Sequence, residues 1–112
     1  MLIRCAEFVG SIRDGKEKEF FQFVREVLTP LWTKFDGAIK VVVSRELERD
    51  EGAPKMPLLL AITYPDNNAL EQAMACDARF QSRDQTKHLL EMFEGKVYHR
   101  VTEAVVYDLE AF

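Results

Sequence analysis

Residues 56–74, "MPLLLAITYPDNNALEQAM", contain the stretch that decides the fold of this 112-residue chain. The run "KMPLLLAITY" (55–64) is nearly continuous in apolar residues and bounded by prolines, which predicts a central strand buried on both faces. After Pro65 come residues that favour a helix N-terminus, and then apolar residues that share one helical face: Leu70, Ala73 and Met74. A buried strand is therefore expected to lead directly into a helix.

The chain before this stretch predicts a strand, a long helix and a second strand. "LIRCAEFVG" (2–10) and "AIKVVVSREL" (38–47) have the composition and alternation of strands. Asp14, three residues before Glu17, predicts a helix N-cap. The helix has an apolar face of Phe20, Val24, Val27, Leu31 and Phe35, widened by Phe21, Phe23, Leu28 and Trp32. Pro30 is expected to kink this helix, and "ERDEGAPKM" (48–56) to form a charged hairpin loop.

The chain after this stretch predicts a broken helix and a long last strand. We expect a break near Cys76–Asp77, after which Thr86, Leu89, Leu90 and Phe93 recur at helical spacing. "KVYHRVTEAVVYDLEAF" (96–112) is more than twice the usual strand length. Its tail, residues 107–112, is therefore expected to outrun its own sheet, where it could pair with another chain.

The predicted order is strand, helix, strand, strand, helix, strand, in two similar halves. Each main helix is followed by Phe, an acid and Gly, at 35–37 and 93–95, and both glycines are expected to form left-handed helix C-caps. Two split βαβ units with right-handed crossovers give an α+β, ferredoxin-like βαββαβ fold. It has a four-stranded antiparallel sheet with both helices on one face. The strand sequences are apolar on both sides, so the uncovered sheet face is expected to bind a partner.

Composition limits the classes of function. A chain of 112 residues, 47% hydrophobic and 30% charged, predicts one domain over residues 1–112. The net charge of −4 argues against a nucleic-acid partner, because binding phosphates needs clustered Lys and Arg. Cys5 and Cys76 stand far apart without metal-ligand spacing, so we expect reduced thiols and no metal site. Without a signal-like or membrane-spanning run, we expect a soluble, cytoplasmic protein and no membrane partner.

The layout and three stretches resemble the dimeric α/β-barrel superfamily, which includes antibiotic-biosynthesis monooxygenase-like and heme-degrading proteins. The stretches are "DGKEKEFFQFV", "ITYPDNNALEQAM" and "LLEMFEGKVYH". The resemblance implies a homodimeric α/β barrel, with two sheets packed face to face and a ligand cavity between each sheet and its helices. It implies no particular reaction, because this fold has many functions. The heme-degrading members use a first-strand asparagine that is absent here, and Trp32 falls on the first helix, so we do not transfer those roles.

The same strand order occurs in RNA-recognition domains. Those domains stack bases on aromatic residues of the first and third strands. The corresponding stretches here, 2–10 and 56–64, lack the basic, glycine and aromatic signature. The acidic balance of the chain agrees with this exclusion.

His99 is the candidate catalytic residue. Alternation places His99, Val101 and Glu103 on one side of the last strand, and Glu7 of the adjacent first strand is expected near that side. A histidine beside carboxylates in an apolar cleft can act as an acid or base. Alternatively, His99 is a hydrogen-bonded residue at the dimer face, with Glu103 paired to Arg4 or Arg100. The catalytic interpretation requires that His99 face the helices.

Aromatic residues define the expected ligand pocket together with Glu7 and Glu103. Trp32 and Phe35 end the first helical segment, and Tyr64 ends the third strand with its hydroxyl available to a ligand. Trp32 could instead seal the helix against the sheet, and Tyr64 could be an ordinary strand-end residue. The arginines of "ARFQSRD" (78–84) could meet an anionic substrate or lie on a solvated helix face. His88 is expected to be solvated.

Two functions are open. The first is a cofactor-independent enzyme, a monooxygenase-like oxygenase or an isomerase, that holds a small, partly aromatic molecule between sheet and helices. It predicts an enclosed cavity containing a polar group. The second is a non-catalytic dimeric binding or interaction module whose loop at 46–55 contacts a partner, and it predicts a filled core. No nucleophile elbow, phosphate loop or metal motif occurs in the sequence to decide between them.

Overall fold

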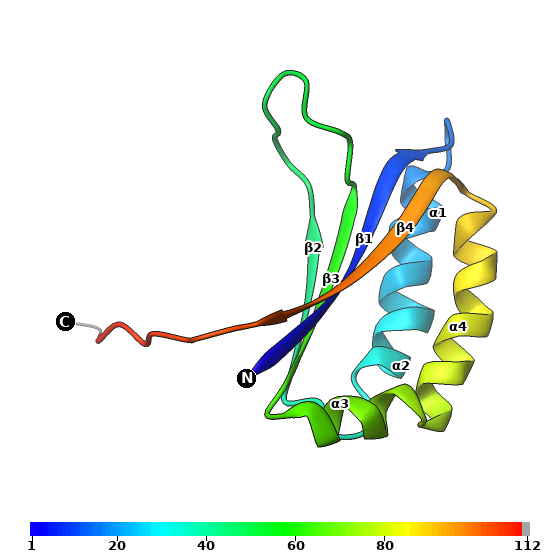
Figure 1. The fold of residues 1–112 in the computed structure, drawn as a ribbon. Coiled ribbons are helices and arrows are strands. Elements are labelled where there is room, and N and C mark those ends of the chain that lie inside the picture. The colour runs from blue at the N-terminus through cyan, green and yellow to red at the C-terminus, as the bar shows by residue number, and fades with distance from the viewer. Residues whose placement is uncertain (111–112) are drawn as a thin grey trace.

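The computed structural model describes residues 1–110 and has a four-stranded antiparallel sheet with its helices on one face (Figure 1). The strands are β1 (Leu2–Ile12), β2 (Lys40–Arg45), β3 (Leu58–Tyr64) and β4 (Phe93–Glu103). Their order across the sheet is β2-β3-β1-β4, so the apolar strand β3 is central, as predicted. Among the described residues, no helix is long and apolar enough to cross a membrane. The ferredoxin-like α+β fold is confirmed.

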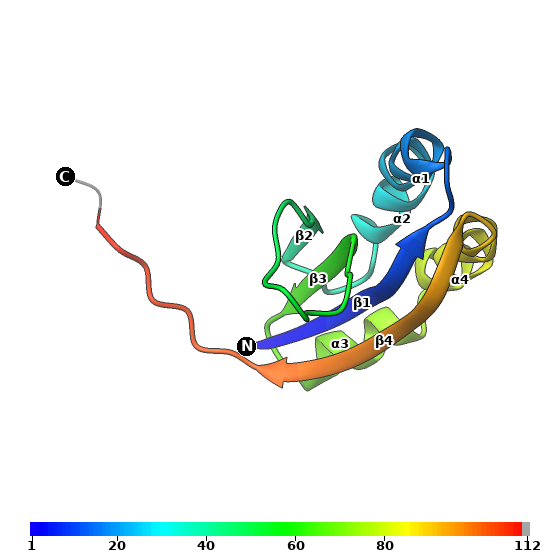
Figure 2. The same cartoon turned by 90° about the horizontal axis from the view of Figure 1, so that it is seen from above.

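The helices form two groups that cover the same sheet face (Figure 2). The first group runs through α1 (Glu17–Phe23), a π-helical segment (Val24–Leu28) and α2 (Thr29–Trp32). The second group is α3 (Asn67–Met74) and α4 (Asp77–Leu90), with the break at Cys76 that the sequence predicts. The core between sheet and helices includes Phe8, Phe20, Leu28, Leu58, Leu89 and Phe93.

Strand pairing decides which residues face the helices. Ala6 lies opposite both Leu60 and His99, and Phe8 lies opposite both Leu58 and Val97. Leu58, Leu60 and Phe8 are buried beneath the helices, and directly paired residues share a sheet face. His99 therefore faces the helices, which is the condition that its catalytic interpretation requires.

The expected position of Glu7 is corrected by the same register. Glu7 pairs with Leu59 and Tyr98, on the face that the helices leave uncovered. Its carboxylate accepts a hydrogen bond from Arg100 at 3.1 Å and forms an ion pair with the same guanidinium at 2.9 Å. Glu7 is thus directed away from His99.

Pro30 is accommodated by a local change of helix type. The N–H of Thr29 donates to the carbonyl of Val24, five residues back, and this widens the turn just before the proline. The wider turn leaves room for the proline ring, which would clash with the preceding turn of a regular α-helix. The sequence predicts a kink at Pro30, and the structure has a π-helical segment just before it.

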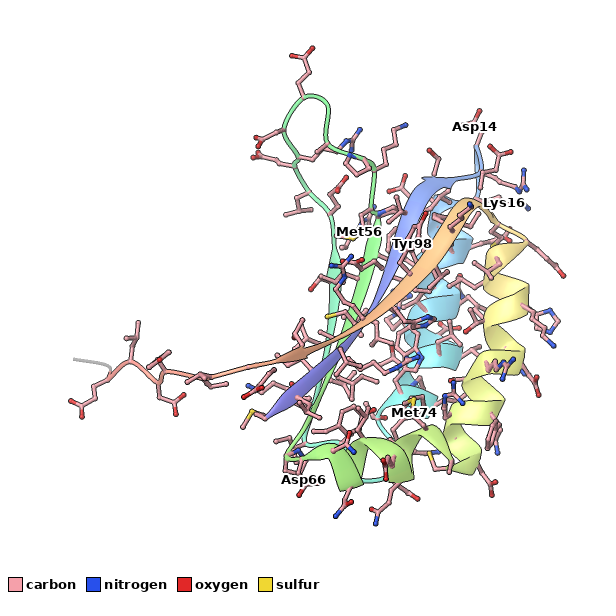
Figure 3. All side chains as sticks on the ribbon, viewed as in Figure 1. Asp14, Lys16, Met56, Asp66, Met74 and Tyr98 are labelled. Carbon is pink, nitrogen blue, oxygen red and sulfur yellow. The ribbon has the colours of Figure 1, made fainter. Side chains whose placement is uncertain are left out.

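The two predicted helix caps differ in outcome. The helix expected after Pro65 is capped by Asp66 (Figure 3), whose side chain accepts a 2.9 Å hydrogen bond from the N–H of Ala69. Asp14 does not cap α1, because that helix begins after Lys16 and has no side-chain cap hydrogen bond. The acidic residues Glu17 and Glu19 still lie in its first turn, at the positive end of the helix dipole.

The two glycines of the apparent repeat have different roles. Gly37 has a left-handed φ of 76°, but it lies in a turn beyond the Thr33 C-cap of α2. Gly95 lies inside β4, opposite Gly10, with a φ of 156°. The prediction that both glycines cap helices is therefore wrong, although the two βαβ units themselves are present.

The C-terminal tail leaves the sheet after β4. The backbone N–H of Ala104 still donates to the carbonyl of Met1, and residues 105–110 then extend away from the helices (Figures 1 and 2). Val105, Tyr107 and Leu109 are 72%, 82% and 93% exposed. The predicted departure of the tail from its own sheet is confirmed. Ala111 and Phe112, the end of that predicted tail, lie outside the described residues.

Candidate functional site

A cavity of about 520 Å³ lies between the helix-facing side of the sheet and the helices α2, α3 and α4. The sheet contributes Arg4, Ala6, Phe8, Leu60, Ile62, Tyr64, Val97 and His99. The helices and their connections contribute Trp32, Phe35, Met74, Arg79, Ser82, Arg83, Thr86, Lys87 and Leu90. This volume is within the range of small-molecule sites in proteins.

The burial of the lining residues shows how the cavity is oriented. Leu60 and Ile62 on β3 form a buried apolar floor. The exposed lining residues lie on α4 and β4, among them Lys87 and His99. The cavity therefore opens between α4 and β4, and its inner end lies at β3 and α2.

The end of the cavity near α3 is closed by aromatic residues and methionine. Trp32 is 3% exposed and Phe35 is 8% exposed, so both are packed into the core while they line the cavity. Trp32 thus seals its helix against the sheet and also forms a cavity wall, the two roles between which the sequence left a choice. Met74, at the end of α3, adds a flexible apolar side chain beside them (Figure 3).

Tyr64 lies inside the cavity rather than at its rim. The residue is 0% exposed, and its hydroxyl has no hydrogen-bond partner among the described residues. Burial raises the pKa of Tyr64 to about 12, and the positive charges of Arg4 and Arg79 oppose that rise. The phenol is therefore neutral at physiological pH and keeps its proton as a hydrogen-bond donor.

His99 lies beside two arginines in the cavity. Its side chain reaches solvent at the cavity opening, and its pKa is lowered first by the partial burial of the ring, then by the positive charges of Arg4 and Arg79. All three effects disfavour the imidazolium form, so His99 is neutral at physiological pH and can accept a proton. This differs from the expected site, in which carboxylates would have raised the pKa of the imidazole.

The cavity is strongly basic although the protein is acidic. Arg4, Arg79, Arg83 and Lys87 line it, and none of its lining residues within the described part of the chain is Asp or Glu. Arg4 has no ion-pair partner among residues 1–110, and its pKa is lowered by burial and then by Arg79. The whole chain carries a net charge of −4, so the positive charge is a local property of this cavity.

Hydrogen bonds orient the residues of α4 that line the cavity. Arg79 donates to the carbonyl of Met74 at 3.0 Å, which fixes one end of its guanidinium and leaves the other N–H groups available. Ser82 donates to the carbonyl of Arg79 at 2.8 Å, and Thr86 donates to the carbonyl of Ser82 at 2.7 Å. Both hydroxyl groups therefore donate to carbonyl groups of α4 and have no proton left to donate to a ligand.

The structure brings together four of the residues named from sequence, and not the two acids. His99, Trp32, Phe35 and Tyr64 line the cavity. Glu7 lies on the opposite face of the sheet, and Glu103 pairs with Leu2 and does not line the cavity. Glu103 forms no ion pair within residues 1–110, either with Arg4 or with Arg100.

Several cavity residues were missed or left undecided by the sequence. Arg4 shares one side of β1 with Leu2, Ala6 and Phe8. Its place among these apolar residues is the signal that a charged side chain faces the helices. Arg79, Arg83 and Lys87 recur every fourth residue, which places them along one face of α4. No group of three or more His, Cys, Asp or Glu side chains within the described residues is placed to hold a metal ion.

The fold is shared with several solved structures. The sequence itself matches no family model and no curated protein. An ethyl tert-butyl ether degradation (EthD) family protein from Bacillus halodurans superposes with a TM-score of 0.71 at 20% identity, covering 94% of this chain and 100% of that one. This chain therefore shares the ferredoxin-like fold of that protein.

Two further similar structures are oxygenases by name. SnoaB, a cofactor-independent oxygenase from Streptomyces nogalater, has a TM-score of 0.66 at 16% identity, with 97% of each chain covered. An antibiotic biosynthesis monooxygenase has a TM-score of 0.62 at 14% identity, covering 95% of this chain and 100% of that one. At these identities the likeness establishes the fold.

Proposed function

We propose that this protein is a homodimeric, cofactor-independent, monooxygenase-like enzyme that acts on a small, partly aromatic molecule in the cavity between sheet and helices. The observation that carries the proposal is a neutral His99 facing a cavity of about 520 Å³ that has an apolar floor and wall. The alternative, a non-catalytic interaction module, predicts a filled core, so the cavity supports the enzyme. The cofactor-independent oxygenase among the similar structures adds support for this class of reaction.

His99 is the proposed general base. A neutral imidazole can accept a proton from an activated C–H or a phenol O–H of a molecule bound beside it. Arg4, next to His99, would stabilise the resulting carbanion or phenolate. Such an anion is electron-rich enough to pass electrons to O₂ directly. For a CH₂ group, the balanced reaction consumes O₂ and gives C=O and H₂O, with all electrons supplied by the substrate.

Tyr64 and the aromatic wall have separate proposed roles. The unpaired Tyr64 hydroxyl would donate a hydrogen bond to an oxygen atom of the substrate. Trp32 and Phe35 would pack against its ring and exclude water from one side. These contacts orient the substrate so that the reacting atom faces His99.

The dimer is proposed from the uncovered sheet face. Cys5, Ala61 and Val42 lie side by side across this face, with Leu59 next to Glu7 in the adjoining row. Val42 is 44% exposed and Tyr98 is 48% exposed in the single chain. A second copy would cover this face, and the extended tail after Ala104 would add contacts to the partner.

The function is tested by oxygen consumption with a panel of electron-rich phenols and naphthalenediols. We expect His99→Gln to lower kcat/KM by about a hundredfold or more, the usual contribution of a general base. His88→Gln is the matched control, because His88 is the other of the two histidines and is exposed on α4. Equal rates for His99→Gln and the parent protein, or no consumption above the uncatalysed rate with any compound, would overturn the proposal.

A further inference from the structure

The basic face of α4 suggests the substrate class of the proposed enzyme. Arg79, Arg83 and Lys87 lie at intervals of four residues and all line the cavity. Lys87 has an exposed partner, Asp84, at 3.8 Å, whereas the two arginines have no carboxylate partner among the described residues. Like charges at intervals of four residues on a helix repel weakly in water, and an anion bound beside them would offset that repulsion.

The rest of the cavity is apolar and suited to a ring or chain. Its floor is Leu60 and Ile62 on β3, and Trp32 and Phe35 form a wall. The cavity is thus amphipathic, with an apolar inner surface and a cationic side along α4. A ligand that matches both surfaces has an apolar body and an anionic group.

Arg79 is the best placed of the three cations for direct recognition. Its hydrogen bond to the carbonyl of Met74, at 3.0 Å, holds the guanidinium at the junction of α3 and α4. A guanidinium that is already oriented loses less side-chain entropy when it binds an anion, and its planar fork matches a carboxylate. Arg83 and Lys87 are exposed, so they lie nearer the opening.

A second observation points to a polar ligand at the inner end of the cavity. The hydroxyl of Tyr64 is buried and has no hydrogen-bond partner among the described residues, which is rare for a buried polar atom. Tyr64 is on β3, on the sheet side, whereas the cations are on α4. A ligand that satisfies both sides must span the cavity.

We propose that the cavity binds small aromatic carboxylic acids, with the carboxylate held by Arg79, the charges of Arg83 and Lys87 attracting it from the opening, and the ring held between Trp32 and the β3 floor. This inference rests on the proposed function, because it names the class of substrate that the proposed enzyme would bind in the same cavity. The carboxylate is a handle for binding and takes no part in the chemistry at His99. Attraction to the α4 cations would also concentrate acidic molecules at the opening of a protein that is otherwise acidic.

The test compares two ligands of nearly equal shape, 2-naphthoate and 2-naphthamide, by isothermal titration calorimetry on the full chain. We expect the acid to bind at least about tenfold more tightly at low salt, because a hydrogen bond to a charged group is stronger than one to a neutral group. The advantage should shrink at high salt, since the α4 cations near the opening are exposed. Equal affinity for acid and amide, or no binding of either, overturns the inference.

Variants identify the residues that recognise the acid. Arg79→Gln should weaken 2-naphthoate by about tenfold and leave 2-naphthamide unchanged. The double variant Arg83→Gln/Lys87→Gln alters only exposed residues, so it remains informative if Arg79→Gln folds poorly. Arg25→Gln, an exposed arginine outside the cavity, is the control and should bind like the parent protein. Unchanged acid binding in the double variant as well as in Arg79→Gln would contradict the assignment.

The two proposals fail separately. An acid preference without oxygen consumption from any electron-rich compound overturns the oxygenase function and leaves the ligand class intact. Oxygen consumption that depends on His99, together with equal binding of acid and amide, overturns the ligand class alone.

Discussion

At the scale of single residues, the hydroxyl of Tyr64 is expected to have opposite effects on stability and on ligand binding. It is buried without a hydrogen-bond partner among the described residues, and such an atom costs about 1–3 kcal/mol of stability. We therefore expect Tyr64→Phe to raise the free energy of unfolding by about 1 kcal/mol in urea denaturation. The same variant should bind an active phenol more weakly, because it lacks the hydroxyl that is proposed to donate a hydrogen bond to the substrate oxygen.

The pH dependence of stability provides an internal check on Tyr64. Its pKa is about 12 in the folded protein against 10 as the ordinary value, so the folded state keeps the proton over that range while the unfolded state loses it. Stability should thus fall as pH rises from 10 toward 12 in the parent protein, and this contribution should be absent in Tyr64→Phe. If Tyr64→Phe were less stable than the parent protein at neutral pH, the hydroxyl would be stabilising the folded state, contrary to the prediction.

His99 should take up a proton when an acid binds beside it. In the free protein its pKa lies below 6.5, because of burial and the charges of Arg4 and Arg79. A carboxylate in the cavity would offset the α4 cations Arg79, Arg83 and Lys87 and raise the pKa of the imidazole. We expect proton uptake on 2-naphthoate binding near pH 6, about the ordinary histidine pKa, and little uptake well above it.

Calorimetry in two buffers of different ionisation enthalpy measures this uptake. His99→Gln should abolish it, whereas His88→Gln, which changes an exposed histidine outside the cavity, should retain it. Proton uptake that persists in His99→Gln would assign the titration to another group. Arg4 and Tyr64, the other ionisable groups facing His99 from the sheet, keep their protons near pH 6, so neither is expected to contribute.

At the scale of elements, the pairing of β1 with β4 depends on the close approach of two glycines. A Cβ atom on Gly95 would lie 2.1 Å from the carbonyl oxygen of Val9, and one on Gly10 would lie 2.1 Å from that of Glu94. Backbone cannot move aside here without breaking the strand pair. We expect Gly95→Ala to destabilise the protein by roughly 4 kcal/mol or prevent its folding, at the extreme of single substitutions.

Gly52 is the matched control for this substitution. It also has a positive φ, 88°, but nothing lies within 4 Å of a Cβ atom built on it in the exposed loop. Gly52→Ala should cost only about 1–2 kcal/mol, the strain of a left-handed alanine. Urea denaturation of both variants measures the difference, and equal costs would show that the backbone contact at Gly95 is not decisive.

The elements were largely predictable from sequence because periodicity and local chemistry determine them. The apolar run of β3, the helix that begins after Pro65 and the break near Cys76 all depend on neighbouring residues, and each was predicted. The failed cap at Asp14 shows the limit, because a spacing that permits a cap does not fix where the helix begins. The π-helical turn before Pro30 likewise depends on how the whole helix packs on the sheet.

The candidate site was only partly predictable because it depends on register between strands. Alternation places His99 and Glu103 on one side of β4, but it does not say which side of β1 is the same face. The pairing of Ala6 with His99 therefore decided that Glu7 is turned away and that Arg4 is turned in. The α4 cations had the spacing of one helix face, and only the tertiary structure shows that this face lines a cavity.

At the scale of the whole molecule, the uncovered sheet face and the tail point to a second copy. Ala61 occupies the middle of that face, between Cys5 on β1 and Val42 on β2. The tail carries exposed Tyr107 and Leu109 away from the helices, beyond the edge of its own sheet. Apolar residues on both features remain in water unless another chain covers them, and a two-fold dimer would cover both at once.

Ala61→Asp tests this arrangement, with Leu47→Asp as its control. Ala61 is only half-buried in the single chain, so an aspartate there should be tolerated by the monomer, whereas in a sheet-to-sheet dimer it would be buried and unpaired. We expect the parent protein to be a dimer in analytical ultracentrifugation and Ala61→Asp to weaken the dimer by about a hundredfold or more, corresponding to roughly 3 kcal/mol. Leu47 is 89% exposed in the loop between β2 and β3, so its aspartate variant should remain dimeric.

Removal of the residues after Ala104 should weaken the dimer less than Ala61→Asp, since the sheet face would remain. A monomeric parent protein, or an Ala61→Asp variant as dimeric as the parent, would mean that the sheet faces do not pair, and the apolar face would then require a different partner.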